Sequence, residues 1–180
     1  MENLGSLDNQ ISEIKQDLVS EFEKQEFKDL MTVSKDDQFD YKQLIKFKKV
    51  SGLYLFEIKN KENQDFDMWL SQFRPKWEGL DIMNTPSLKQ IRILKHKNTS
   101  PTWIPLYIGK SNNLFDRIKG HFVLRSNQRT VGLKLNERVN LKDEIIKISI
   151  IKLECTNYSI IAPIAESTLR NRLNPIVGRQ

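Results

Sequence analysis

Two tyrosines, each two residues from a glycine in a strand-like run, are the first residues whose spacing could serve chemistry. They stand in Gly52-Leu53-Tyr54 and in Tyr107-Ile108-Gly109. A glycine within a strand often permits close approach of another chain segment. If the two strands pair antiparallel, both phenols point into one cleft. Either triplet alone can arise by chance, and the alternative for each tyrosine is a half-buried sheet aromatic.

A polar stripe follows the second triplet. Lys110, Asn113, Arg117 and His121 recur at spacings of three and four residues, so they share one face of a helix predicted to begin near Ser111. Arginine binds phosphate through two donors and offsets charge in a transition state. Histidine accepts or relays a proton near neutral pH. The alternative reading is a solvated basic helix face.

A carboxylate completes the set. Glu166 falls in the first turn of a final helix predicted to run from Pro163 to Leu173. An acidic residue there is stabilised by the helix dipole and needs no other reason to be present. It can equally be a ligand of Mg²⁺, with Mn²⁺ as a substitute, because Mg²⁺ takes few carboxylates together with waters and phosphate oxygens. The absence of paired acidic motifs favours a one-metal site.

Hydrophobic periodicity predicts the elements that must position these residues. Strands are expected at 50–58, 103–109 and 144–154, the last from alternation of Ile146, Ile148 and Ile150 with polar residues. A helix is expected over 66–73, ending before Pro75, and a second one from Pro86. The basic segment 125–142 is expected to be mostly loop.

The N-terminal part reads differently. Residues 4–22 predict an amphipathic helix of about two heptads, which favours docking on its own domain over a dimer contact. A polar linker is expected over 34–40. The apolar positions of the predicted helix are Leu4, Leu7, Ile11, Ile14, Leu18 and Phe22.

Composition limits the kinds of ligand and the cellular setting that the protein is expected to have. Among 180 residues, 29 basic side chains outnumber 23 acidic ones, giving a formal charge of +6 that favours a polyanion. The single Cys155 cannot form an internal disulfide, and two histidines cannot build a His-rich zinc cage. The sequence shows neither a secretory signal pattern nor an apolar run of membrane-spanning length. These features predict a soluble cytoplasmic protein.

Taken in order, the motifs resemble the GIY-YIG nuclease family. Gly52-Leu53-Tyr54 carries Leu where the family usually has Ile, and Tyr107-Ile108-Gly109 matches in full. The family's helix arginine, its histidine one turn later, its glutamate and its downstream asparagine match Arg117, His121, Glu166 and Asn174. The resemblance covers about residues 50–58 and 104–175.

The resemblance implies an α+β fold, with a small three-stranded antiparallel sheet flanked by helices. It implies a nuclease domain over 41–180, preceded by a helical extension over 1–40 and interrupted by a helical insertion at about 59–102. The family usually keeps its two tyrosine motifs close together, so this insertion is the largest departure. It offers Arg74, Lys76, Trp77, Lys89 and Arg92 as DNA contacts.

The resemblance also implies hydrolysis of DNA phosphodiester bonds with Mg²⁺ held by Glu166. Tyr54 would be the general base, helped by Lys110, with His121 as the alternative base. Arg117 would stabilise transition-state charge. Orienting and supporting roles would fall to Tyr107 and Asn174.

Within the family, the chain is most like a stand-alone Type II restriction endonuclease that cuts double-stranded DNA, acts as a dimer or tetramer and is paired with a DNA methyltransferase. Phage-type, homing and repair nucleases are alternatives, as is a catalytically silent DNA-binding module. The DNA-contacting residues expected after the catalytic helix are Lys119, Arg125, Arg129, Lys134 and Arg138, with Asn127 and Gln128 as further base-reading candidates.

Overall fold

The computed structural model describes residues 2–34 and 40–178, so most of the predicted linker at 34–40 lies outside the described residues. Its centre is a sheet of four antiparallel strands in the order β1-β5-β2-β4. Strands β2 (Gly52–Lys59), β4 (Trp103–Ser111) and β5 (Ile145–Lys152) correspond to the three that were predicted. The α+β class is confirmed.

The predicted number of strands is wrong, because β1 (Lys28–Ser34) adds a fourth along the outer side of β5. This strand comes from the segment expected to be a helical extension. It lies at the sheet edge, and Val33 is its one buried residue. Half-exposed edge strands need few apolar residues, so hydrophobic alternation does not reveal them.

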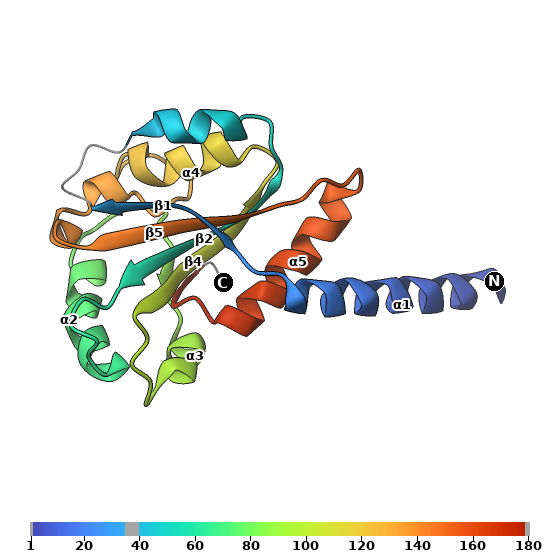
Figure 1. The fold of residues 1–180 in the computed structure, drawn as a ribbon, viewed down its shortest axis with the longest axis horizontal. Helices are drawn as coiled ribbons and strands as arrows, with labels where there is room; N and C mark the ends of the chain where they lie inside the picture. Colours follow the sequence, from blue (N-terminus) through green and yellow to red (C-terminus); the bar gives the residue numbers. More distant parts are fainter. Residues whose placement is uncertain (1, 35–39, 179–180) are drawn as a thin grey trace.

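Residues of β2 alternate between the two faces of the sheet. Tyr54 and Phe56 belong to a large core shared with α4 (Leu114–Val123), α2 (Phe66–Glu78) and the 3₁₀ helix η1 (Tyr41–Phe47). Leu53 and Leu55 belong to a smaller core shared with α5 (Tyr158–Leu173) and the end of α1 (Glu2–Lys24). Helices α4 and α5 therefore cover opposite faces, as Figure 1 shows.

Helix α1 docks on its own domain only at its C-terminal end, where Phe22 is buried and Leu18 is half-buried. Residues 3–17 are all exposed, and this part of the helix projects away from the sheet and its covering helices (Figure 1). The predicted docking therefore holds for the last turns and is wrong for the rest.

The insertion is part of the main core. Stacked rings of Phe66, Trp69, Phe73 and Trp77 follow one face of α2, with successive centroids 5.9, 4.7 and 5.8 Å apart. The helix runs through Pro75, so the predicted stop there is wrong. Pro75 sits on the exposed face near the helix end, where water can satisfy the carbonyl that loses its partner.

The second half of the insertion is joined to the C-terminal segment. A helix was predicted from Pro86, but a two-residue strand comes first: β3 (Ser87–Leu88) pairs with β6 (Val177–Gly178). The Lys89 N–H then donates to the Ile176 carbonyl across 2.8 Å. Short helices α3 (Gln90–Ile93) and η2 (Leu94–His96) follow.

Helix α5 begins at Tyr158, ahead of the predicted start at Pro163. Pro163 is again an exposed proline inside the helix, at a position where solvent replaces the lost hydrogen bond. Two short 3₁₀ helices, η3 (Leu135–Glu137) and η4 (Val139–Leu141), lie in the predicted loop 125–142. None of the helices in the described ranges has the length and apolar character needed to span a membrane.

Candidate active site

The hydroxyl oxygen of Tyr54 is the centre of a buried polar cluster. It accepts a hydrogen bond from Arg117 Nε across 3.1 Å and lies 2.9 Å from His121 Nε2. Tyr54 and His121 are each 1% exposed. Residues from β2 and α4 thus meet on one face of the sheet, whereas Glu166, which was predicted to complete the set, belongs to α5 on the other face.

Hydrogen bonding assigns the tautomer of His121. Its Nδ1 accepts from the backbone N–H of Leu133 across 3.0 Å, so in the neutral ring the proton is on Nε2. Nε2 therefore donates to Tyr54. Burial, aided by the charge of Arg117, holds the pKa of His121 well below its usual range. With Nε2 protonated and Nδ1 occupied, His121 positions Tyr54 and has no free lone pair for a water.

Arg117 bridges the cluster to the loop after α4. Besides its bond to Tyr54, Arg117 donates a hydrogen bond from Nη1 to the Val131 carbonyl across 3.1 Å. Burial alone would lower its pKa, but interactions with Tyr54 and Tyr107 outweigh that effect and raise the pKa. Tyr107 is buried, and its ring centroid lies 6.2 Å from that of Tyr54 and 5.2 Å from the imidazole.

The glycines of both triplets are explained by close approach. A Cβ at Gly109 would lie 2.2 Å from the Tyr54 hydroxyl, so any other residue would push that hydroxyl away. A Cβ at Gly52 would lie 2.2 Å from the Ile151 carbonyl oxygen. Gly109 therefore leaves space for the Tyr54 hydroxyl, which lies against the neighbouring strand β4.

Lys110 and Glu166 form a second cluster. Their side chains make a direct ion pair, with Lys110 36% and Glu166 17% exposed. Lys110 belongs to β4 and pairs with Leu53, so it lies on the sheet face that α5 covers. It does not share a helix face with Arg117, as the sequence spacing predicted, because the strand continues to Ser111.

The two clusters come from opposite faces but from the same end of the sheet, where β2 begins and β4 ends. Tyr54 pairs with Gly109, the residue next to Lys110. Burial chiefly raises the pKa of Tyr54, and the negative charge of Glu166 contributes in the same direction. Glu166 is therefore close enough to act on Tyr54 electrostatically, although no hydrogen bond or ion pair joins it to Arg117 among the described residues.

Glu166 lies in the middle of α5, more than two turns from its N-terminus, because the helix starts earlier than predicted. The helix dipole stabilises acidic side chains only within about the first turn. This position removes the dipole as the reason for an acidic residue here, and it leaves the ion pair with Lys110 and a possible cation as the remaining reasons.

Sequence reasoning missed Arg170 and gave Arg92 only as a general DNA contact. Arg170 is one turn after Glu166, on the same helix face. Burial lowers the pKa of Arg92, the positive charge of Arg170 lowers it further, and Glu166 raises it, so the three charges lie near one another. Lys110 contacts Glu166 directly, and Arg92 and Arg170 add positive charge in the same region, which suits an anion.

Two predicted site residues serve as helix caps. The Asn113 side chain caps α4, since it accepts from the Asp116 N–H across 3.2 Å. Asn174 ends α5 in a left-handed conformation (φ 50°), and its side-chain amide donates to the Arg172 carbonyl. Asn174 therefore shapes the helix end rather than contacting the tyrosine cluster.

The described ranges, 2–34 and 40–178, contain no group of three or more His, Cys, Asp or Glu side chains arranged to hold a metal ion. Mg²⁺ requires less than that, since one carboxylate, waters and a phosphate can complete its shell. Glu166 supplies that one hard oxygen donor, and Lys110 competes with a cation for it. The donor set thus fits Mg²⁺ bound together with an anionic substrate.

The residues expected to contact DNA divide into two groups. Arg125 and Arg129 are exposed, and Lys119 is half-buried with its ammonium 5.3 Å from the Tyr41 ring centroid. Lys134 and Arg138 are fully buried, so their prediction as DNA contacts is wrong.

The buried pair is structural. Lys134 Nζ donates to the carbonyls of Met83, Ser126 and Gln128. Arg138 lies 3.6 Å from the Trp77 ring centroid and donates to the Leu133 and Trp77 carbonyls. Burial lowers the pKa of Arg138 to about 10. Both cations hold loop carbonyls in place of water.

Three side chains of the insertion that were predicted to contact DNA, Arg74, Lys76 and Trp77, interact with other residues of the protein instead. Trp77 is buried and donates to the Pro86 carbonyl. Lys76 pairs with Glu144 across 2.6 Å, and Arg74 lies 3.5 Å from Glu78.

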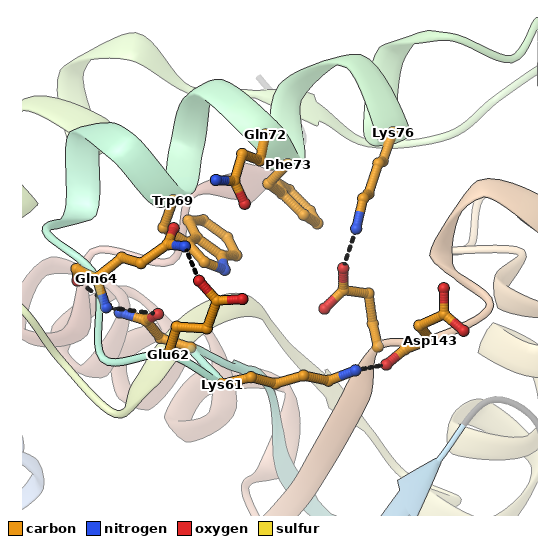
Figure 2. Close-up of a pocket in the computed structure, with 10 residues that line it drawn as sticks. Lys61, Glu62, Gln64, Trp69, Gln72, Phe73, Lys76 and Asp143 are labelled. Atoms are coloured by element: carbon orange, nitrogen blue, oxygen red, sulfur yellow. Dashed lines mark hydrogen bonds and ion pairs between the residues drawn. The ribbon is translucent and has the colours of Figure 1, made fainter.

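A separate cavity of about 210 Å³ lies at the other end of β2, beside α2 (Figure 2). Trp69 and Phe73 form an aromatic wall, and Lys61 and Lys76 reach into its rim (Figure 2). Lys76 pairs with Glu144, and Lys61 donates to the Asp143 carbonyl. Because both lysines are already engaged and acidic side chains line the same rim, this cavity does not suit a phosphate group.

Comparisons with protein families, with curated proteins and with solved structures found no match to this chain.

Proposed function

We propose that this protein is a Mg²⁺-dependent endonuclease of the GIY-YIG type, which hydrolyses phosphodiester bonds in double-stranded DNA. The observation that carries the proposal is the hydrogen-bonded set of Tyr54, Arg117 and His121 beside the Lys110–Glu166 pair. These residues were selected from sequence order alone. Tyr54, Arg117 and His121 lie on one face of the sheet, and Lys110 and Glu166 lie on the other face at the same end of β2 and β4.

Charge supports a phosphate ligand at this end. Arg117 keeps one guanidinium nitrogen on the Tyr54 oxygen, Lys110 contacts Glu166, and Arg92 and Arg170 add positive charge in the same region. Guanidinium groups bind phosphate in a fixed planar geometry, and they stabilise the charge that builds up during phosphoryl transfer.

Tyr54 has a specific part in the mechanism. Its oxygen accepts from Arg117 and His121, so its own O–H remains free to donate, and in the proposed complex it would donate to a water or a phosphate oxygen. Burial raises its pKa and keeps the phenol neutral, whereas the two donors favour the phenolate. Tyr54 therefore becomes the general base only when more positive charge enters the site.

Mg²⁺ held by Glu166 would lower the pKa of a bound water and neutralise phosphate charge. Lys110 must release the Glu166 carboxylate for that to happen, and it then becomes free to bind a phosphate oxygen. His121 fixes the position of Tyr54, and the close packing of Tyr107 excludes water from the inner side of the cluster.

The test is incubation of the purified protein with supercoiled plasmid or phage DNA, with Mg²⁺ and with EDTA. Cleavage is expected only with the metal. Arg117→Ala and Glu166→Gln should abolish cleavage and retain DNA binding. Glu154→Gln, which changes an exposed acid after β5, is the matched control. Cleavage in EDTA, or full activity of Glu166→Gln, would contradict the mechanism.

The pattern of products distinguishes the types of nuclease. Discrete bands indicate a sequence-specific enzyme of the Type II restriction kind, for which a dimer or tetramer and a companion DNA methyltransferase are expected. A smear indicates a degradative enzyme of the phage type.

A second candidate is a catalytically silent DNA-binding module. The Lys110–Glu166 ion pair favours it, because the lysine neutralises the one carboxylate available for a metal. DNA that is bound but left intact at all Mg²⁺ and Mn²⁺ concentrations would support this candidate over the nuclease.

A further inference from the structure

The projecting part of α1 carries an unpartnered apolar stripe. Its four members have large exposed fractions, which are 66% for Leu4, 46% for Leu7, 64% for Ile11 and 59% for Ile14. They lie at alternating spacings of three and four residues, so they line one side of the helix. Single exposed apolar side chains are ordinary, but a contiguous stripe marks an interaction surface.

The helix itself needs a partner. Residues 3–17 are all exposed, so no tertiary contact within the described chain supports this stretch. It contains Gly5, Ser6, Asn9 and Ser12, which are weak helix formers. Isolated helices of this length are marginal in water, and most helical stability in proteins comes from packing of an apolar face.

We propose that this stripe, Leu4, Leu7, Ile11 and Ile14, pairs with the same stripe of a second copy, and that the two α1 helices run antiparallel. The spacing is that of the first and fourth positions of a heptad, the pattern through which helices pair with their own kind. A surface that meets its own copy about a two-fold axis is the commonest route to a soluble dimer.

The fold argues for the antiparallel direction. The stripe continues into Leu18 and Phe22, and that end is covered by α5. A parallel partner would bring its own α5-covered end to the same place, where the two bodies would compete for space. Because the rest of the protein lies at the C-terminal end of α1 (Figure 1), an antiparallel partner places the two bodies at opposite ends of the helix pair.

Charge complementarity agrees with that direction. Asp8 and Lys15 flank the stripe on the same side, one heptad apart. In an antiparallel pair centred between Ile11 and Ile14, Asp8 of each copy faces Lys15 of the other. In a parallel pair, by contrast, Asp8 faces Asn3 and Lys15 faces Gln10, and no ion pair forms.

The experiment measures the mass of the full chain by sedimentation over a range of concentrations. The wild type is expected to form a dimer. Ile11→Asp combined with Ile14→Asp should weaken dimerisation about 100-fold or more, because each copy would bury two charges without partners. Asn9→Asp with Gln16→Glu adds the same charge on the opposite side of the helix and is the matched control. All four positions project from the body, so its thermal unfolding shows that each variant is folded.

A charge swap tests the direction. Asp8→Lys alone and Lys15→Glu alone should each weaken the dimer roughly 10-fold through facing like charges, and the double variant should regain wild-type affinity. A monomer at every concentration up to about 0.1 mM, or a dimer indifferent to the Ile11/Ile14 variant, would overturn the proposal. A dimer unaffected by the single charge changes would overturn the antiparallel arrangement. Neither measurement depends on whether the protein cleaves DNA.

Discussion

His121 Nε2 lies 2.9 Å from the Tyr54 hydroxyl oxygen, and the Leu133 N–H on its other nitrogen leaves one neutral tautomer, in which Nε2 is the donor. The imidazole therefore supports the phenol and does not compete with it as the base. This relationship makes the hydroxyl of Tyr54 a structural acceptor, whereas its role as a reactive group belongs to the proposed mechanism, and both roles are testable.

Removing that hydroxyl should cost stability and activity together. Tyr54→Phe leaves the Arg117 and His121 donors buried without an acceptor, which lowers the free energy of unfolding by about 1–3 kcal/mol. Urea denaturation measures the loss, and single-turnover DNA cleavage should fall about 100-fold or more. Tyr158→Phe is the control, because the Tyr158 hydroxyl has no hydrogen-bond partner among the described residues. A stable, active Tyr54→Phe variant would remove Tyr54 from the site.

The glycine beneath that hydroxyl should be irreplaceable. Gly109→Ala puts a methyl group 2.2 Å from the Tyr54 oxygen, and overpacking of this kind costs about 1–3 kcal/mol. Gly120→Ala is the contrasting variant. Gly120 lies inside α4, and a Cβ there would have its nearest neighbour, the Leu124 side chain, 3.9 Å away. We expect this change to stabilise the protein by about 0.5–1 kcal/mol. Thermal unfolding of both variants checks the pair. Equal effects of the two changes would refute the close approach.

Stability should fall in mild acid because of His121. Burial lowers the pKa of His121 in the folded protein below 6.5, the ordinary value that it has in the unfolded chain. At a pH between the folded and the unfolded pKa, the unfolded chain therefore binds a proton that the folded chain does not. The contribution of neutral His121 to the free energy of unfolding is fully present above pH 6.5. Below pH 6.5 it falls by about 1.4 kcal/mol per pH unit. Urea denaturation from pH 7.5 to 5 should show a shallower pH dependence for His121→Asn than for the wild type. Parallel curves would contradict the buried neutral imidazole.

Substitution of the buried Arg138 should lower stability, whereas substitution of the exposed Arg129 should lower DNA affinity. Arg138→Ala strips two backbone carbonyls and the Trp77 ring of their partner, so we expect a loss of roughly 3 kcal/mol. Arg129→Ala, at an exposed position, should leave stability unchanged and reduce the salt dependence of DNA binding by about 0.9 in log–log slope. Salt titrations followed by fluorescence anisotropy measure that slope. An unchanged slope would exclude Arg129 from the DNA contact.

Freeing the carboxylate should strengthen metal binding. Lys110→Met removes the competing ammonium from Glu166, and because this pair is partly exposed, stability should change by less than about 1 kcal/mol. Thermal shift against Mg²⁺ and Mn²⁺ should then reach half of its maximum at a lower metal concentration than in the wild type. Lys142→Met, at an exposed position, controls for the loss of one charge. An equal or weaker metal response would mean that Glu166 is not the ligand.

Sequence reasoning was strongest where a residue type has one physical explanation. Alternating isoleucines placed β5, and the glycines of the two triplets marked two close approaches, that of Gly109 to the Tyr54 side chain of β2 and that of Gly52 to the Ile151 carbonyl of β5. It failed where the environment decides. Pro75 and Pro163 are tolerated because they face solvent, and exposure cannot be known from a helical pattern.

The same limit explains the errors in the site. Lys134 and Arg138 have the composition of a DNA-contacting loop, and only the tertiary fold shows that they bind carbonyls instead. Lys110 was assigned to a helix face because a strand and a helix follow one another without a break in polarity. Arg170 was missed because it belongs to none of the family's motifs, although it follows Glu166 by one turn in the predicted helix as well.

The pairing of distant strands has a consequence for how this chain acquires its structure. Gly52 of the central strand pairs with Lys152, and Lys28 of the edge strand pairs with Ile150. Contacts so remote along the chain require large loops to close before any stabilising interaction is gained, which slows folding. On a ribosome, β1 must therefore wait unpaired until β5 has emerged, and β2, which can pair with β4 earlier, keeps its other edge open until then.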